Sequence, residues 1–375
     1  MVQERAMKFQ IASSKLLEYL QIVLGAVPGK TALPILGNVL MEAGDTGIML
    51  AATDLEISIS SIIEIKPEKK GSLTVPAKTF AEIIRELPET EVSISSENNR
   101  MEISTKSGQY KISGIAADEF PRIPEYASAK EIRIAGEEFV RMVRKTAFAV
   151  SADESRPALN GVLWQTSGEK MVMVATDGHR LAKISLENTK LRGIAEDLII
   201  PPKALNAVVK LIGDQKKEIG VVFGEKNIMF RVGSTIISSK LFEGPYPNFD
   251  QVIPTDNDKR LILSKNDLAA AVRRVSILSN SLTHQVKFGL DRNKLLLSAT
   301  NIDLGGEAKE ELVCEYKHDK MELGYNATYV EEILRQMDSE EVVFELSSPV
   351  SAGVIYAADR TDDYLCLIMP LRLAD

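Results

Sequence analysis

Apolar and polar residues alternate along this chain with two different periods. Short segments such as GVLWQT and EISISS place every second side chain on one side, which predicts strands with one buried face. Longer segments carry apolar residues at helical spacing, for example Phe80, Ile83, Ile84 and Leu87. The pattern therefore predicts an α+β protein in which amphipathic helices pack on antiparallel sheets.

This series of elements occurs three times. The residues at matching strand ends, Thr53, Thr176 and Thr300, are separated by 123 and 124 positions (176 − 53 and 300 − 176). The residues that precede the second helix of each unit are 125 positions apart each time: Pro76, Pro201 and Asn326. A period this long is typical of complete domains rather than of stacked short repeats.

Each repeat is predicted to form a domain with two helices on antiparallel sheet. The predicted domains are residues 7–126, 131–253 and 258–373. Polar linkers that contain or adjoin proline separate them, around residues 125–130 and 254–258. The residues before Met7 and the tail Ala374-Asp375 extend beyond the repeats.

Charge is unevenly distributed along the chain. The 375 residues carry a formal net charge of −8, which argues against a general nucleic-acid-binding protein. The predicted helices are nevertheless basic and include Arg141, Arg144, Lys145, Lys203 and Arg273. These charges are either the ordinary solvated faces of surface helices or a phosphate-facing surface that does not read base sequence.

Other features concern the cellular compartment and the cysteines. No apolar segment reaches the roughly 18 residues of a membrane span, and the first residues lack a signal-peptide pattern. We therefore expect a cytoplasmic protein without membrane partners. Cys314 and Cys366 lie in apolar, strand-like segments, so we predict buried reduced thiols rather than a disulfide or a metal site.

The segment VATDGHRLA brings together residue types found in active sites. Asp177 and His179 are a candidate acid and base, and Arg180 a candidate anion clamp, as in a metal-free hydrolase or transferase. The chain has no GxSxG, HExxH or Walker A motif, so we assign no catalytic residue, metal or cofactor. Asp177 has counterparts in the other repeats, which predicts a strand-end turn held by its side chain. His179 and Arg180 have none, which favours a function at this copy alone.

The three α+β repeats, the TDGHRLA corner and the ending MPLRL together resemble the bacterial sliding clamp, the β subunit of DNA polymerase III. The segments LPILGN, EFPRIP, ALNGVLW and YPNF add to the resemblance, which covers residues 7–373. It implies a non-catalytic processivity factor, with polymerase activity in a partner. It also implies that two chains pair head to tail into a ring of six domains around double-stranded DNA, which the helices face.

The resemblance also implies where DNA and the second chain are contacted. Lys30 and Arg156 match the family's DNA-contacting positions and would join Arg141, Arg144, Lys203 and Arg273 of the helices in a sequence-independent surface. The dimer contact would combine an edge strand of the first domain with a helix end of the third. The residues that we expect there are Tyr110, Ile112, Ile277 and Leu278, since apolar residues on a sheet edge favour pairing across a dimer.

A peptide-binding pocket between the middle and last domains is the third implication. Its expected occupants are short segments of the replicative polymerase catalytic subunit, the clamp loader, an exonuclease, repair and translesion polymerases, ligase and mismatch-repair proteins. A groove of apolar residues with a few polar groups suits such anchors. The expected walls are Leu159, Thr176, Gly178, His179, Arg180, Leu181, Pro247, Val252, Asn326, Tyr329, Val350, Met369, Pro370, Leu371 and Arg372.

Overall fold

The structure is a computed structural model that describes residues 6–125, 131–167, 170–187, 197–213, 217–360 and 363–373. Most of the first linker, at residues 126–130, and the tail residues 374–375 lie outside the described residues, as do residues 1–5. Contacts between residues divide the chain into two compact units. These are Met1–Val140 with Lys203–Leu241, and Arg141–Pro202 with Phe242–Asp375.

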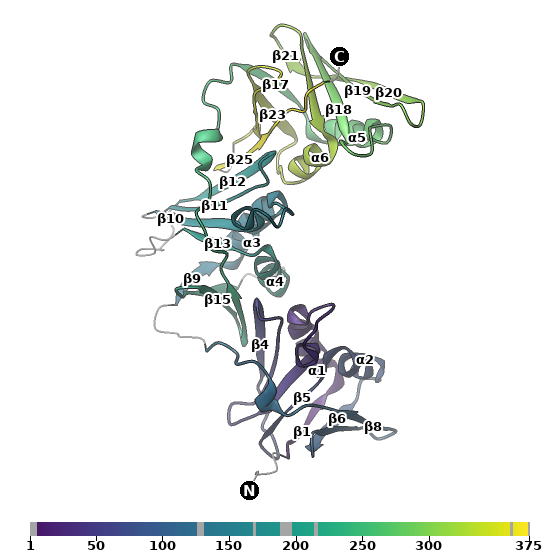
Figure 1. The fold of residues 1–375 in the computed structure, drawn as a ribbon, viewed down its shortest axis with the longest axis vertical. Helices are drawn as coiled ribbons and strands as arrows, with labels where there is room; N and C mark the ends of the chain where they lie inside the picture. Colours follow the sequence, from purple (N-terminus) through teal and green to yellow (C-terminus); the bar gives the residue numbers. More distant parts are fainter. Residues whose placement is uncertain are drawn as a thin grey trace. The chain divides into compact units, whose positions relative to one another are not determined.

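The first unit is built on two antiparallel sheets (Figure 1). The eight-stranded sheet runs in the order β5 (Gly71–Pro76), β2 (Asn38–Ala43), β3 (Ile48–Thr53), β4 (Ile57–Ile63), β16 (Thr235–Lys240), β15 (Asn227–Val232), β14 (Glu218–Phe223) and β9 (Ile132–Ala135). The four-stranded sheet runs β1 (Lys8–Ala12), β6 (Glu91–Glu97), β7 (Arg100–Ser104) and β8 (Gln109–Ser113).

Helices α1 (Ser13–Val23) and α2 (Ala77–Glu86) pack side by side in this unit. Their apolar faces are buried as their spacing predicts: Leu16, Leu20 and Phe80 are fully buried and Ile84 is 1% exposed. Helix α4 (Pro202–Ile212) likewise buries its periodic apolar face. These helices form because their apolar stripes have a sheet surface to cover.

The second unit repeats this plan. Its nine-stranded sheet runs β13 (Leu198–Ile200), β10 (Val162–Ser167), β11 (Lys170–Thr176), β12 (Arg180–Leu186), β25 (Asp363–Ile368), β24 (Gly353–Ala357), β23 (Glu341–Leu346), β17 (Lys259–Ser264) and β21 (Glu315–Tyr316). The four-stranded sheet runs β20 (Gly306–Val313), β19 (Lys294–Asn301), β18 (Gln285–Asp291) and β22 (Met321–Asn326). Helices α5 (Lys265–Ser276) and α6 (Ala327–Arg335) pack together beside it (Figure 1).

The α+β class and the three repeats of two helices are confirmed by these elements, with α3 (Gly136–Thr146) and α4 belonging to the middle repeat. The large sheets run from one repeat into the next, because β4 pairs with β16 and β12 pairs with β25. This continuity explains why three sequence repeats form two contact units. No helix in the described part of the chain is long and apolar enough to cross a membrane.

Both cysteines are free and buried, as predicted. Burial raises the pKa of the Cys314 thiol to about 11 and that of the Cys366 thiol to about 12. Because the thiolate is the reactive form, neither residue should react with a disulfide reagent such as DTNB at pH 8 in the folded protein. We expect both to react once the chain is unfolded in guanidinium. Rapid labelling without denaturant would contradict this burial.

Candidate functional site

The TDGHRLA corner is a tight turn between β11 and β12, closed by its own side chains. The Thr176 hydroxyl donates to the Arg180 carbonyl over 2.6 Å, and the Gly178 N–H donates to Thr176 Oγ1 over 3.1 Å. The Asp177 carboxylate accepts the N–H groups of His179 and Arg180 over 2.8 and 3.0 Å. Gly178 has φ of +90°, a conformation that glycine adopts without strain. The predicted side-chain-held turn is confirmed.

The first repeat contains the same arrangement. The Thr53 hydroxyl donates to the Ile57 carbonyl over 3.0 Å, and the Ile57 N–H donates to Asp54 over 2.8 Å. In the third repeat Asn301 accepts the Leu304 N–H over 3.1 Å. The threonine in the first two repeats and the acidic or amide residue in all three therefore have a structural role, whereas the residues that follow them differ between the repeats.

Arg180 is a buried link rather than an exposed clamp. Its guanidinium is 8% exposed and donates to Asp177 Oδ2 over 3.1 Å and to the Phe148 carbonyl over 2.8 Å. It also pairs with Glu332 of α6. It lies 4.4 Å from the centre of the Tyr329 ring, a cation–π contact. Arg180 thus ties the corner of the middle repeat to a helix of the last repeat.

These contacts remove the basis for an acid–base pair at the corner. Both oxygens of Asp177 are committed, one to the backbone of the turn and one to Arg180, so Asp177 is not placed to orient His179. His179 itself is exposed. Within the described residues, no group of three His, Cys, Asp or Glu side chains could hold a metal ion.

An apolar cavity of about 300 Å³ lies beside the corner. Its walls come from the corner, from η6 (Pro157–Asn160), from the segment 247–252 that contains η7 (Phe249–Val252), and from the end of β25. Strand pairing brings these parts together: Leu181 is opposite Leu367, and the Met369 N–H donates to the His179 carbonyl over 2.8 Å. The predicted wall residues that line it are Leu159, Thr176, Gly178, His179, Arg180, Leu181, Pro247, Val252 and Met369.

Other predicted wall residues do not line this cavity. Asn326 caps α6 by accepting the N–H groups of Thr328 and Tyr329, and Tyr329 stacks on Arg180. The Leu371 N–H donates to the Gly324 carbonyl, so this part of the tail is an added bridge on β22. The remaining three are Val350, which is 70% exposed, Pro370 and Arg372.

Four lining residues escaped the sequence reasoning: Asn248, Phe249, Ala352 and Leu367. Asn248 and Phe249 belong to the YPNF segment, which is one of the segments that carry the family resemblance. The sequence therefore did contain a signal for these two residues. Leu367 and Ala352 depend on the pairing of β25 with its neighbours, which no local pattern specifies.

The structure leaves most of the predicted DNA-facing cations at the surface. Lys30 and Arg144 are exposed and Arg141 is half-buried. Arg156 pairs with Asp153 over 3.0 Å, and Arg273 is 71% exposed, 3.7 Å from Glu331. Lys203 is exposed and pairs with Asp54. Burial acts to raise the pKa of Asp54, but hydrogen bonds from the Ile57 backbone and Lys203 outweigh it and the pKa is lowered.

Lys145, in contrast, does not belong to this exposed set. It is 4% exposed, donates to the Gln336 carbonyl over 3.1 Å and pairs with Asp338 over 2.7 Å. The helix position suggested a surface cation. The residue instead links two repeats inside the second unit.

The predicted dimer residues divide into exposed and buried ones. Strand β8 is an edge, as expected, because β7 is its only neighbour in the described sheet. Ile277 is 73% exposed and Tyr110 is 38% exposed, whereas Leu278 is half-buried. Ile112 is only 8% exposed, so its side chain is largely covered within its own chain. It faces the core of its own domain, and at this point the edge offers mainly backbone groups.

Comparison with known proteins identifies the family. Three family models match the chain in order: the DNA polymerase III β subunit N-terminal domain over residues 7–124, central domain over 133–248 and C-terminal domain over 250–372. The chain belongs to the DNA polymerase III β subunit family. Its members are the bacterial sliding clamps, so the sequence resemblance is confirmed.

Relatives match the chain over almost its whole length. A β sliding clamp of Escherichia coli (strain K12) is 33% identical over 370 residues, which cover 98% of this chain and 100% of the relative. A solved DNA polymerase III β subunit of Pseudomonas aeruginosa is 31% identical with a TM-score of 0.92, again over 98% of this chain and 100% of the other. A sliding clamp of Bartonella birtlesii, solved with griselimycin bound, has a TM-score of 0.94 at 31% identity over the same shares.

Membership of the DNA polymerase III β subunit family decides between the alternatives that the sequence left open. The chain is a sliding clamp, a DNA replication processivity factor and a non-catalytic subunit. The hydrolase or transferase reading of Asp177, His179 and Arg180 is therefore set aside, in agreement with the committed hydrogen bonds of Asp177.

Proposed function

We propose that the apolar cavity beside the corner binds a short linear segment of the proteins that this clamp tethers to DNA. The supporting observation is the cavity itself, because its volume of about 300 Å³ is that of a small ligand site. Two exposed apolar residues, Val252 (57%) and Met369 (43%), stand at its rim and would be covered by an apolar anchor. The flexible Met369 side chain would adapt to anchors of different shape.

Several partners would compete for this one cavity. We include the replicative polymerase catalytic subunit, the clamp loader, an exonuclease, repair and translesion polymerases, ligase and mismatch-repair proteins. All would present the same chemistry, namely apolar side chains on a segment without its own fold. Binding would depend on apolar burial, so moderate salt should weaken it little.

Replacing Val252 by glutamate tests this assignment. A carboxylate at the apolar rim would have to be desolvated on binding, which we expect to cost about 2–3 kcal/mol and to weaken binding by roughly 30- to 150-fold. The measurement is fluorescence anisotropy with a labelled synthetic peptide that carries adjacent leucine and phenylalanine. Because Val252 is exposed, the thermal unfolding midpoint should not change.

The matched control is Val313→Glu, which adds the same charge at a side chain that is 88% exposed and lies outside the cavity. Its affinity for the peptide should equal that of the parent protein. Equal loss of binding in both variants would mean that charge acts at long range, and no loss in either would reject the cavity as the binding site.

We further propose that two chains close head to tail into a ring that holds duplex DNA by enclosure. The exposed cations Lys30, Arg144 and Arg273 would contact phosphates, with Arg141, Arg156 and Lys203 beside them. Such contacts can remain weak, because enclosure and not affinity retains the DNA. This would reconcile DNA binding with the net charge of −8.

Retention on DNA should depend on topology. Protein loaded by a clamp loader onto nicked circular plasmid should remain bound through gel filtration, and linearising the plasmid should release it. We expect Arg144→Glu with Arg273→Glu to reduce loading at least tenfold while the chain stays dimeric. Retention on linear DNA at moderate salt would indicate ordinary binding in place of enclosure.

A further inference from the structure

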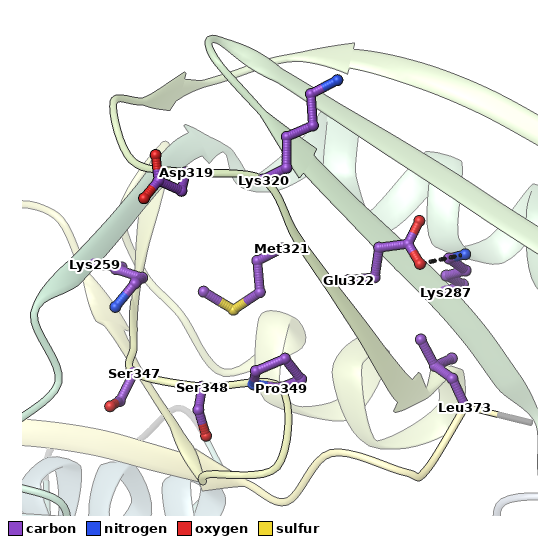
Figure 2. Close-up of a pocket in the computed structure, with 10 residues that line it drawn as sticks. All are labelled: Lys259, Lys287, Asp319, Lys320, Met321, Glu322, Ser347, Ser348, Pro349 and Leu373. Atoms are coloured by element: carbon purple, nitrogen blue, oxygen red, sulfur yellow. Dashed lines mark ion pairs between the residues drawn. The ribbon is translucent and has the colours of Figure 1, made fainter. Parts of the chain in front are cut away.

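A second and larger cavity, of about 660 Å³, lies in the last repeat. Figure 2 shows it between β22 and the loop that follows β23, with the start of β17 on one side. Neither the sequence pattern nor the proposed function uses it. Its walls raise the question of what it could bind.

The walls combine an apolar part with donor groups. Met321, Pro349 and Leu373 form the apolar part, and the Met321 side chain points into the middle of the cavity (Figure 2). The Lys259 ammonium faces it from the opposite side, whereas the Ser348 hydroxyl is directed away from the cavity and lies 2.7 Å from the Ser351 hydroxyl. The site therefore suits a ligand with an apolar group next to an acceptor of hydrogen bonds.

The same two segments of the chain contribute walls to both cavities, although no residue lines both. Met369 lines the first cavity and Leu373 lines the second, four residues further along the same segment. On the loop after β23, Pro349 lines the second cavity and Ala352, three residues further along, lines the first. Four residues span at most about 14 Å, so one extended peptide of similar length would reach from one cavity to the other.

We propose that the second cavity is a subsite for the same bound segment, and that it takes an apolar side chain with a neighbouring carboxylate. This rests on the proposed function of the first cavity. The apolar side chain would lie on Met321, Pro349 and Leu373. The carboxylate would accept hydrogen bonds from the Lys259 ammonium.

The charges around the cavity leave Lys259 able to accept a new partner. Its Nζ pairs over 2.7 Å with the neighbouring Asp258, whose side chain is 69% exposed. An ammonium has three donors, and exposed pairs of this kind are weak, so a second carboxylate can be added. Of the two acidic residues in the walls, Glu322 is paired with Lys287 over 2.7 Å, and Asp319 lies on the same side of the cavity as Lys259 (Figure 2).

Synthetic peptides test the proposal directly in the full-length protein. The parent peptide carries only the apolar anchor of the first cavity. Three derivatives add a four-residue Gly-Ser spacer followed by Leu-Asp, Leu-Lys or Ser-Asp, at either end of the anchor. We expect Leu-Asp at one of the two ends to bind about tenfold more tightly than the anchor alone, and the other derivatives to gain threefold or less.

Variants of Lys259 identify the group responsible. Lys259→Met and Lys259→Glu should remove the gain from Leu-Asp without changing the affinity for the anchor alone, and Lys259→Arg should preserve it. Lys317→Glu is the matched control, since Lys317 also pairs with an acidic neighbour, is 74% exposed and does not line the cavity. Thermal unfolding of each variant verifies that the fold is intact.

The outcomes separate the two proposals. Failure of the anchor peptide to bind would reject the function of the first cavity, and with it this extension. Binding of the anchor with no gain from any derivative would reject the second subsite alone. A larger gain from Leu-Lys than from Leu-Asp would overturn the assignment of Lys259 as the partner.

Discussion

Replacing Ile277 by glutamate should convert the dimer into monomers. Ile277 lies at the end of α5 and is 73% exposed, although it is a large aliphatic residue. In the proposed head-to-tail ring it would be covered at both contacts between the chains. Each contact would lose the burial of an isoleucine side chain and would have to accommodate a carboxylate, which we expect to cost about 3 kcal/mol. With two such contacts in the ring, the dissociation constant should rise on the order of 10⁴-fold. Analytical ultracentrifugation over a range of concentrations measures this.

The control for this variant is Val350→Glu, which changes a residue of similar exposure (70%) in the loop between the two cavities. It should remain a dimer. The Ile277→Glu monomer should still bind the anchor peptide with unchanged affinity, because the residues that line the cavity belong to one chain. An unchanged dimer in Ile277→Glu would place the contact elsewhere.

Replacing Arg180 by methionine should have the largest effect on stability. The change leaves Asp177 and Glu332 without their shared cation and leaves the Phe148 carbonyl without its donor. Breaking a buried ion pair from one side costs about 3–5 kcal/mol. We expect that decrease in the free energy of unfolding in urea, with the earliest amide exchange in β12 and α6.

A second substitution on the same strand provides the comparison. Lys183 of β12 pairs with Asp250 over 2.9 Å, but the Asp250 side chain is 66% exposed. Lys183→Met should therefore cost no more than about 1 kcal/mol. Similar decreases in the free energy of unfolding for Arg180→Met and Lys183→Met would show that the buried contacts of Arg180 stabilise the fold no more than the more exposed ion pair of Lys183 does.

Local features of the fold could be predicted from the sequence because their causes lie within a few residues. The turn at Thr176 and Asp177 is closed by bonds that reach at most four positions along the chain. The buried faces of α1 and α2 follow from helical spacing alone. For these elements the chain contains both partners of each interaction in one short segment.

Features that depend on distant partners could not be predicted in this way. Arg180 meets Glu332 at a separation of 152 residues, and Lys145 meets the Gln336 carbonyl at a separation of 191. From their own segments, Arg180 was predicted as an anion clamp or pocket wall and Lys145 as a cation on a helix face. The burial of the Ile112 side chain could not be predicted for a related reason, because an alternating pattern does not tell which face of an edge strand is covered.

The Thr-Asp turn also affects which positions of the repeated domains can change in sequence without loss of the fold. The threonine and aspartate accept the backbone N–H groups of the two residues that follow them, Leu55-Glu56 in the first repeat and Gly178-His179 in the second. Because these bonds involve only the backbone of the two residues, their side chains can change while the turn persists. A repeated domain can thus acquire a new surface without a change of fold. The binding surface of one repeat can therefore change, while the corresponding turns of the other repeats keep only their structural role.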